Sequence, residues 1–293
     1  MIKKSIIFAT LALISGILFI APDALAAQPA EWQLGLQDAA SPSAERITEF
    51  HNMLLYIITG ITLFVLALLI YVCVRFNAKA NPTPSSTTHH VGLEVLWTIV
   101  PVIILIIIAV PSFKLLYYVD RVAEPEMTLK VTGYQWYWGY EYPDHDGMAF
   151  SSYMIEDADI DEKKGQVRLL STDNPVVLPI DTDIQVLVTA GDVLHSWAMP
   201  AFGVKTDSVP GRLNETWMNI SKPGVYYGQC SEICGVKHAY MPIEVHALPK
   251  ADYETWVARA KVEFAENGSV DTGTLLATLK AENAITDVAT AAQ

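Results

Sequence analysis

One stretch of the sequence combines thiol, imidazole and thioether side chains, and it reads Cys230-Ser231-Glu232-Ile233-Cys234-Gly235-Val236-Lys237-His238-Ala239-Tyr240-Met241. Thiolate and thioether sulfur suit Cu(I), and imidazole suits copper in either oxidation state, whereas sites for Mg, Ca or Mn are built from carboxylates. Gly228 and Gly235 bracket the two cysteines, which favours a folded-back loop over a helix. The stretch therefore predicts a copper-binding loop.

A further ligand is expected from elsewhere in the chain, and His195 is the best candidate because it directly follows a strand-like run. A blue-copper site uses one Cys with two His and a weak axial Met, but this loop has two cysteines. Two thiolates can bridge two copper ions, so a binuclear centre is favoured. The alternative is a disulfide between Cys230 and Cys234, with His238 and Met241 as packing residues. That alternative leaves the spacing of the His and the Met unexplained.

Together with His195, the loop resembles the CuA site of subunit II of cytochrome c oxidase, and the resemblance extends back to the first long apolar segment. It implies that both cysteines bridge two coppers through sulfur and that each copper receives one imidazole. A thioether and a backbone carbonyl would be the weak ligands. The residues concerned are Cys230, Cys234, His195, His238 and Met241, with the carbonyl of Glu232.

The composition indicates a membrane protein with an acidic surface. Of the 293 residues, 52% are hydrophobic, which is more than an ordinary soluble protein has. Acidic residues outnumber basic ones by 32 to 19, which argues against a nucleic-acid partner and favours a basic one. Only three cysteines occur, so the chain is not a disulfide scaffold.

Residues 1–26 have the order of a secretory signal peptide. Lys3 and Lys4 precede an apolar run, and the triplet Ala24-Leu25-Ala26 follows it, so cleavage is expected after Ala26. The alternative is an uncleaved third membrane anchor, although the run is short for spanning a bilayer. In either case the polar, acidic segment 27–50 is expected outside the cytoplasm.

Two uncharged runs, residues 53–74 and 95–113, are long enough to cross a bilayer as helices and predict a transmembrane hairpin over residues 51–118. The loop between them contains Arg75 and Lys79 but no acidic residue, so the positive-inside tendency places it in the cytoplasm. Both chain ends and the copper domain are then expected on the periplasmic side of a bacterial inner membrane.

Glu94 stands at the cytoplasmic start of the second predicted helix. An acidic residue in the first turn is favourable for the helix macrodipole, which is a sufficient structural explanation. An ionisable group at the edge of the apolar zone is also a candidate for proton uptake. In subunit II of the oxidases, a Glu at the matching place is associated with the mouth of a proton path into subunit I. Both interpretations stay open.

From Met127 onward, short β-type runs alternate with turn residues and predict a β-sandwich or barrel. The runs are 128–132, 167–170, 176–180, 184–189 and 224–227. The resemblance implies an α+β membrane protein in which the hairpin precedes an all-β, cupredoxin-like Greek-key barrel over residues 119–248. His195 would follow one strand, and the copper loop would connect two late strands. Within residues 249–293 we expect a helix over 252–266 and a tail that is ordered only by its contacts, if at all.

The aromatic stretch 133–142 is the second informative segment. Strand alternation puts Trp136, Trp138 and Tyr140 on one face, where they can simply be core residues. The stretch also resembles the aromatic segment of oxidase subunit II, in which a Trp matching Trp136 receives electrons from cytochrome c. Tyr134 departs from the His that is common at that place, so no imidazole role carries over to it.

Residues 119–246 contain 19 acidic and 9 basic residues. Solubility alone can explain that charge, whereas an acidic surface near Trp136 would steer a basic redox partner. Glu141, Asp173 and Asp192 match family positions linked to docking of cytochrome c. The resemblance also implies that the carboxylate of Glu232 holds Mg or Mn where subunits I and II meet, and a solvated Glu is the alternative.

The sequence is therefore interpreted as subunit II of a proton-pumping cytochrome c oxidase. The resemblance implies that this chain takes electrons from cytochrome c at CuA and passes them to haem in subunit I, which also holds CuB and reduces oxygen to water. Subunit III and membrane lipid would be further partners. One alternative is a membrane-tethered copper-delivery protein, which would not need Trp136 or Glu94. Another is a quinol oxidase subunit II, which would lack the copper ligands.

Overall fold

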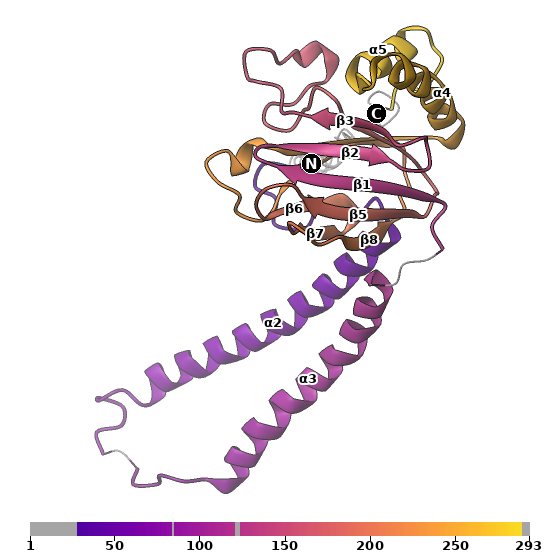
Figure 1. Cartoon of the computed structure of the whole chain (residues 1–293). Helices are drawn as coiled ribbons and strands as arrows, with labels where there is room; N and C mark the ends of the chain where they lie inside the picture. The colour runs from indigo at the N-terminus through magenta and orange to yellow at the C-terminus, as the bar shows by residue number, and fades with distance from the viewer. Residues whose placement is uncertain (1–27, 84, 121–123, 289–293) are drawn as a thin grey trace, which may run out of the picture.

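The computed structural model describes residues 28–83, 85–120 and 124–288, so the expected signal peptide lies outside the described part of the chain. Two long helices lead into a domain of two β-sheets, and two further helices follow it (Figure 1). The α-helices are α2 (Pro42–Arg75), α3 (Val91–Val119), α4 (Lys250–Asn267) and α5 (Thr272–Ala281). The strands are β1 (Met127–Tyr134), β2 (Tyr137–Tyr142), β3 (Met148–Ser152), β4 (Val176–Pro179), β5 (Ile184–Ala190), β6 (His195–Met199), β7 (Val204–Ser208), β8 (Asn214–Met218), β9 (Gly224–Cys230) and β10 (Pro242–Leu248). Three short 3₁₀ helices are Glu162–Lys164, Pro200–Phe202 and His238–Tyr240.

The predicted helical hairpin is confirmed, and both helices are longer than their uncharged runs. The helix α2 begins at Pro42 because Ser41 caps it, with the Ser41 hydroxyl accepting from the amide of Ala44 at 3.0 Å. The same hydroxyl donates to the carbonyl of Phe202 at 2.7 Å, which ties the start of α2 to the β-domain. The apolar side chains in the middle of α2 and α3 are exposed, as lipid-facing side chains would be.

The strands form two five-stranded sheets, ordered β3-β2-β1-β5-β8 and β4-β10-β9-β6-β7. Buried residues alternate with half-buried ones along β1 and β5, so one face of the first sheet is buried. That face packs against the second sheet around one core that includes Leu129, Val186, Trp197 and Val245. The predicted all-β domain of the cupredoxin type is confirmed, and Figure 1 shows its two layers above the helices.

Two details of the strand predictions are wrong. Residues 167–170 form a turn, because the amide of Leu170 bonds back to the carbonyl of Val167 at 3.1 Å and Leu169 has a φ of 66°. His195 does not directly follow a strand, because β5 ends at Ala190 and His195 is the first residue of β6.

Trp136 also lies outside the regular strands. It is in the turn between β1 and β2, where the peptide bond joining it to Gln135 is cis. Within β2, alternation holds as expected, since Trp138 and Tyr140 are buried on one face.

The helix expected over 252–266 is confirmed as α4, but the tail contains a second helix, α5. Asp271 caps α5 by accepting from the amide of Thr274 at 2.8 Å. Leu276 and Leu279 lie three residues apart and are buried, so one side of α5 packs on the domain. The first turn of α5 is bonded to the β-domain, because the hydroxyl of Thr272 donates to the carbonyl of Pro175 at 2.8 Å.

Candidate metal centre

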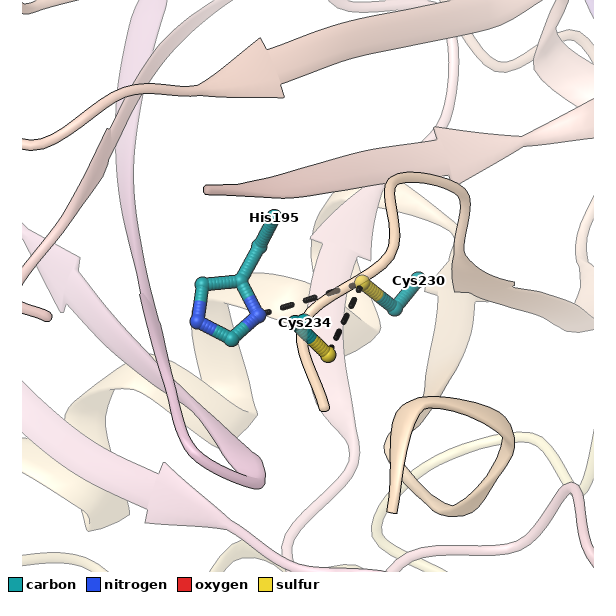
Figure 2. Close-up of side chains that lie close together, drawn as sticks. All are labelled: His195, Cys230 and Cys234. Carbon is teal, nitrogen blue, oxygen red and sulfur yellow. Dashed lines mark hydrogen bonds between the residues drawn. The ribbon is translucent and has the colours of Figure 1, made fainter. Parts of the chain in front are cut away.

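His195, Cys230 and Cys234 lie together and buried at one end of the second sheet (Figure 2). His195 opens β6, Cys230 closes β9, and Cys234 lies in the loop between β9 and β10. The Cys230 sulfur is 3.9 Å from Nδ1 of His195 and 3.9 Å from the Cys234 sulfur. The predicted meeting of His195 with the cysteine loop is therefore observed.

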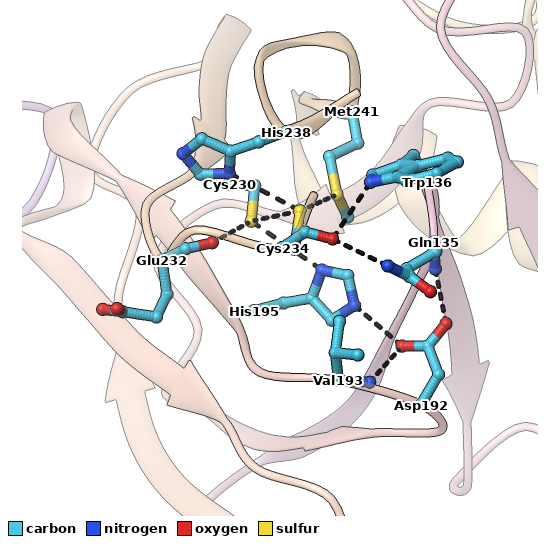
Figure 3. A network of polar contacts seen from close by, with 10 residues as sticks. All are labelled: Gln135, Trp136, Asp192, Val193, His195, Cys230, Glu232, Cys234, His238 and Met241. Carbon is cyan, nitrogen blue, oxygen red and sulfur yellow. Dashed lines mark hydrogen bonds and ion pairs between the residues drawn. The ribbon is translucent and has the colours of Figure 1, made fainter. Parts of the chain in front are cut away.

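The remaining expected groups surround the same two sulfurs (Figure 3). The Cys234 sulfur is 3.5 Å from Nδ1 of His238 and 3.6 Å from the Met241 sulfur. The Cys230 sulfur is 3.4 Å from the backbone carbonyl oxygen of Glu232. All six groups expected from the sequence thus converge, and each sulfur has its own neighbouring imidazole.

The two cysteines are separate thiols. Their sulfur atoms lie 3.9 Å apart, whereas the sulfurs of a disulfide lie about 2.05 Å apart. The alternative of a Cys230–Cys234 disulfide is therefore not what the structure contains.

Backbone pairing and close packing hold the loop in place. Cys230 lies opposite Trp197 in the β6–β9 pair, and the amide of Ser231 donates to the carbonyl of Ser196 at 3.0 Å. The buried indole of Trp138 donates to the carbonyl of Met241 at 3.2 Å. Gly133 leaves room for the ring of His195, because a Cβ at that position would lie 2.9 Å from it.

Burial and hydrogen bonds set the protonation of the donor groups. Burial acts to raise the pKa of the Cys230 thiol, but hydrogen bonds with His195 and with backbone groups lower it to about 7. Burial and the adjacent Cys230 charge raise the pKa of Cys234 to about 12. Burial acts to lower the pKa of His195, but its contacts with Cys230 and Asp192 raise it. Two thiolates this close repel each other, so a cation between them would stabilise the doubly ionised pair.

Trp136 contacts the loop directly. Its indole nitrogen donates to the carbonyl of Cys234 at 3.2 Å, and the side-chain amide of Gln135 donates to the same oxygen at 2.8 Å. The sequence interpretation did not single out Gln135. Only its position next to Trp136 in the sequence indicates a role for Gln135. A single Gln in a turn belongs to no metal-ligand spacing and to no helix or strand periodicity.

The three acidic residues assigned to docking have partners within this chain. Glu141 forms an ion pair with Lys130 at 2.7 Å. One oxygen of Asp173 accepts from the amides of Tyr153 and Asn174 at 2.8 and 2.6 Å, and burial raises the pKa of this carboxyl.

Asp192 bonds to His195 at 2.9 Å and lies within the site. Burial acts to raise the pKa of the Asp192 carboxyl, but hydrogen bonds from His195 and two backbone amides lower it overall.

The carboxylates of two further candidates, Glu94 and Glu232, lie apart from the sulfurs. Glu94 is in the first turn of α3, at the end remote from the β-domain (Figure 1). The carbonyl of Glu232 faces the Cys230 sulfur, whereas its carboxylate points away from the sulfur pair (Figure 3).

The donor set fits copper. Two thiols, two imidazoles, a thioether and a carbonyl form a soft to borderline set, and no carboxylate oxygen is among them. Metal–thiolate bonds to a comparable ion, Zn²⁺, are about 2.3 Å long. Two sulfurs 3.9 Å apart can therefore both bind an ion placed between them.

Comparison with known proteins finds family matches over most of the chain. The sequence family "Cytochrome C oxidase subunit II, periplasmic domain" matches residues 127–248, and the family's "transmembrane domain" matches residues 29–115. The chain is 50% identical to the probable cytochrome c oxidase subunit 2 of Rickettsia felis, over 86% of this chain and 79% of the relative. It is also 50% identical to cytochrome c oxidase subunit 2 of Oenothera berteroana, over 80% of this chain and 91% of the relative.

A solved structure, the periplasmic domain of subunit II of the cytochrome oxidase of Bradyrhizobium japonicum, is 46% identical. It covers 49% of this chain and 99% of its own, with a TM-score of 0.45.

The transmembrane match and the helices α2 and α3 make this chain an inner-membrane protein. Its relatives are named as subunits of an oxidase, so the chain is part of an oxidoreductase enzyme. It belongs to the cytochrome c oxidase subunit II family.

Proposed function

We propose that this chain is the electron-accepting subunit of its oxidase and that the convergent donors hold a binuclear copper centre, CuA. One observation carries the proposal: two free sulfurs lie 3.9 Å apart, and each has an imidazole nitrogen within 3.9 Å. Cys230 and Cys234 would bridge the ions, and His195 and His238 would each bind one of them. Met241 and the carbonyl of Glu232 would complete the coordination.

The copper pair, when bound, would accept and release one electron. The chain's contribution is to hold most of the ligands away from water. Cys230, Cys234 and Met241 are buried and His195 is fully buried, whereas His238 is half-buried. Because buried, packed ligands change little in position between oxidation states, the reorganisation that accompanies electron transfer should be small.

Electrons would arrive from cytochrome c through Trp136. Its indole is half-buried at the surface and donates directly to the backbone of a bridging cysteine. The domain's excess of acidic over basic residues would attract a basic cytochrome c and raise the rate of encounter. Glu141, Asp173 and Asp192 are the residues that the family resemblance proposes for docking.

Subunit I would receive the electron at its haem, and with its CuB it would reduce oxygen to water. The copper loop itself supports such a neighbour, because Ile233 and Val236 are 73% and 87% exposed in the isolated chain. Exposed apolar side chains of this size in a functional loop favour a covering protein surface. The carboxylate of Glu232 would hold Mg or Mn at that join, and Glu94 would stand at the mouth of a proton path.

The remaining assignments follow from the same proposal. The copper domain, residues 119–248, would lie in the periplasm, and the segment 75–93 between the helices would lie in the cytoplasm. Residues 1–26 would be removed as a signal peptide, and subunit III would complete the core of the complex.

Metal analysis of the purified oxidase tests the proposal. We expect two coppers in subunit II, and we expect Cys230→Ser to abolish both the near-infrared copper absorption and cytochrome c oxidation. A copper-delivery protein would purify without a haem protein, and a quinol oxidase subunit would contain no copper here. Unimpaired turnover of the Cys230→Ser oxidase would exclude the proposed role.

A further inference from the structure

Trp138 lies in the core of the domain and contacts two residues of the candidate metal centre, Met241 and His195. We propose that Trp138 is a positioning residue, which holds the Met241 thioether and the His195 ring in place and thereby sets the reduction potential of the site. The inference rests on the proposed copper centre. It gives a role in electron transfer to a residue that packing alone would otherwise explain.

The indole of Trp138 fixes the backbone at Met241. Trp138 is fully buried on β2, and its Nε1 donates to the carbonyl oxygen of Met241 at 3.2 Å, across 103 residues of the chain. Met241 is 1% exposed and lies just outside the β9–β10 pair, whose register begins at Pro242. A buried carbonyl requires a donor. The indole provides one at a point where the strand ladder has not yet begun.

The position of the Met241 backbone decides where its sulfur lies. That sulfur is 3.6 Å from the Cys234 sulfur. A methionine side chain has three rotatable bonds and adapts readily to its surroundings, so a fixed backbone is needed to give its sulfur one place. A weak axial thioether is one of the groups that set the potential of a copper site. The indole hydrogen bond therefore acts on the potential through Met241.

The ring of Trp138 also confines the imidazole of His195. The two ring centres are 6.0 Å apart and the ring planes are inclined by 62°, which is an edge-to-face arrangement. Such pairs attract at centre distances of about 4.5–7 Å. Gly133 lies opposite Trp138 in the β1–β2 pair, and a Cβ there would be 2.9 Å from the same imidazole. The β1–β2 hairpin thus leaves the His195 ring little room to tilt.

The two contacts reach donors beside different sulfurs. Met241 neighbours Cys234 at 3.6 Å, and Nδ1 of His195 neighbours Cys230 at 3.9 Å. Trp138 belongs to the first sheet, whereas His195 and Cys230 belong to strands of the second. One side chain therefore holds donors on both sides of the sulfur pair from the facing sheet.

Trp256 provides the matched comparison. It is fully buried on α4, where its ring packs against Tyr142 and Tyr253. In the part of the chain that the structure describes, its indole nitrogen has no hydrogen-bond partner. Trp256→Phe therefore removes the same indole from the same core without removing a hydrogen bond.

The test compares Trp138→Phe with Trp256→Phe in the purified oxidase. The readouts are copper content, the electron paramagnetic resonance spectrum, the copper reduction potential, and kcat and KM for cytochrome c. Loss of a group that orients a metal ligand typically costs about 10- to 100-fold. For Trp138→Phe we expect a shifted potential, an altered spectrum and a kcat about 10-fold lower, with KM unchanged because Trp138 is buried. Trp256→Phe should leave the spectrum and the potential unchanged.

A double substitution shows whether the indole acts through the thioether. In an oxidase that already carries Met241→Leu, there is no thioether to position, so Trp138→Phe should shift the potential much less than it does in the unmodified oxidase. Equal shifts in the two backgrounds would show that Trp138 does not act through Met241, and the inference would be wrong.

A closer analogue covers the case in which Trp138→Phe does not assemble. Benzothienylalanine at position 138 replaces the indole N–H by sulfur and keeps the shape of the ring, so it removes only the hydrogen bond. Two bound coppers with an unchanged spectrum and potential in this variant would overturn the inference. An unmodified oxidase without two coppers in this subunit would overturn the proposed function instead.

Discussion

The guanidinium carbon of Arg46 lies 3.8 Å from the centre of the Tyr118 ring, so the first turns of α2 are held against the last turn of α3. The Tyr118 ring also packs edge-on against Trp217 of β8, with the ring centres 5.5 Å apart. A cation over an aromatic ring at an exposed site contributes about 0.5–1 kcal/mol. This contact therefore stabilises the place where both helices meet the β-domain.

Arg46→Met should loosen the end of α3. The amide of Asp120 bonds to the carbonyl of Leu116 at 3.0 Å, and its hydrogen exchange reports on fraying of that last turn. Loss of the cation–π contact should speed exchange at Asp120 about two- to fivefold. Arg75→Met is the control, because Arg75 lies 6.0 Å from the Phe76 ring at the opposite end of α2. Equal effects of both substitutions at Asp120 would contradict this assignment.

Gly228→Ala should disrupt the copper loop from within β9. A Cβ at this position would lie 2.1 Å from the carbonyl oxygen of Ala198 and 2.5 Å from the Met199 sulfur. Because a backbone atom of β6 cannot move aside without breaking the strand pair, we expect a cost of about 1–3 kcal/mol or more. Copper content and the unfolding midpoint should both fall.

The control for this substitution lies on the same strand. A Cβ at Gly224 would be 3.4 Å from the Tyr226 ring, an ordinary contact, so Gly224→Ala should retain copper. A Gly228→Ala protein with full copper content would show that the β6–β9 spacing is not needed by the site.

His145 should make the domain less stable in mild acid. Its Nε2 lies 2.9 Å from the Tyr253 hydroxyl, and its pKa is lowered by burial and by the charge of Lys261, against the opposing charges of Asp144 and Asp146. The unfolded chain binds the proton near the ordinary pKa of 6.5, before the folded chain does. Stability should therefore fall as the pH drops below that value and level off once the folded-state pKa is passed.

Unfolding midpoints from about pH 7.5 to about pH 5 measure this effect. His145→Gln cannot titrate, so the pH dependence of its midpoint should be smaller than that of the unmodified protein. Identical slopes for the two proteins would assign the acid sensitivity to other groups.

Leu279→Ala should detach α5 without affecting the copper loop. Leu279 is completely buried, and replacing a buried Leu by Ala costs about 2–5 kcal/mol. Limited proteolysis should then cut within α5 while the copper spectrum stays the same. Thr278→Ala, at an exposed neighbouring position, should remain resistant. A copper spectrum that changes with Leu279→Ala would instead couple α5 to the metal site.

The residues that converge at the site could be predicted because chemistry and spacing coincide in one loop. Cys230, Cys234, His238 and Met241 are soft or borderline donors within a single turn-rich segment, and only His195 had to come from elsewhere. The transmembrane helices could be predicted because an uncharged run of about 20 residues has few other structural solutions.

Other features depend on contacts that no local pattern encodes. The hydrogen bond from Gln135 spans 99 residues to the carbonyl of Cys234, and the turn must fold before the two can meet. Residues 167–170 resemble a strand in composition, but Arg168 pairs with Asp157 at 2.8 Å on the surface of a turn. The helix α5, by contrast, could have been predicted from local sequence features, namely Asp271 as an N-cap and the spacing of Leu276 and Leu279.

The last strand, β10, lies between β4 and β9, with Val245 opposite both Val176 and Tyr226. Within the part of the chain that the structure describes, it is the only strand of its sheet that follows the copper loop. A nascent polypeptide therefore exposes both thiols while the strand that closes their loop is still being made. Assembly of the proposed copper centre should therefore follow the folding of nearly the whole domain, because the loop is closed only once β10 has paired with β9.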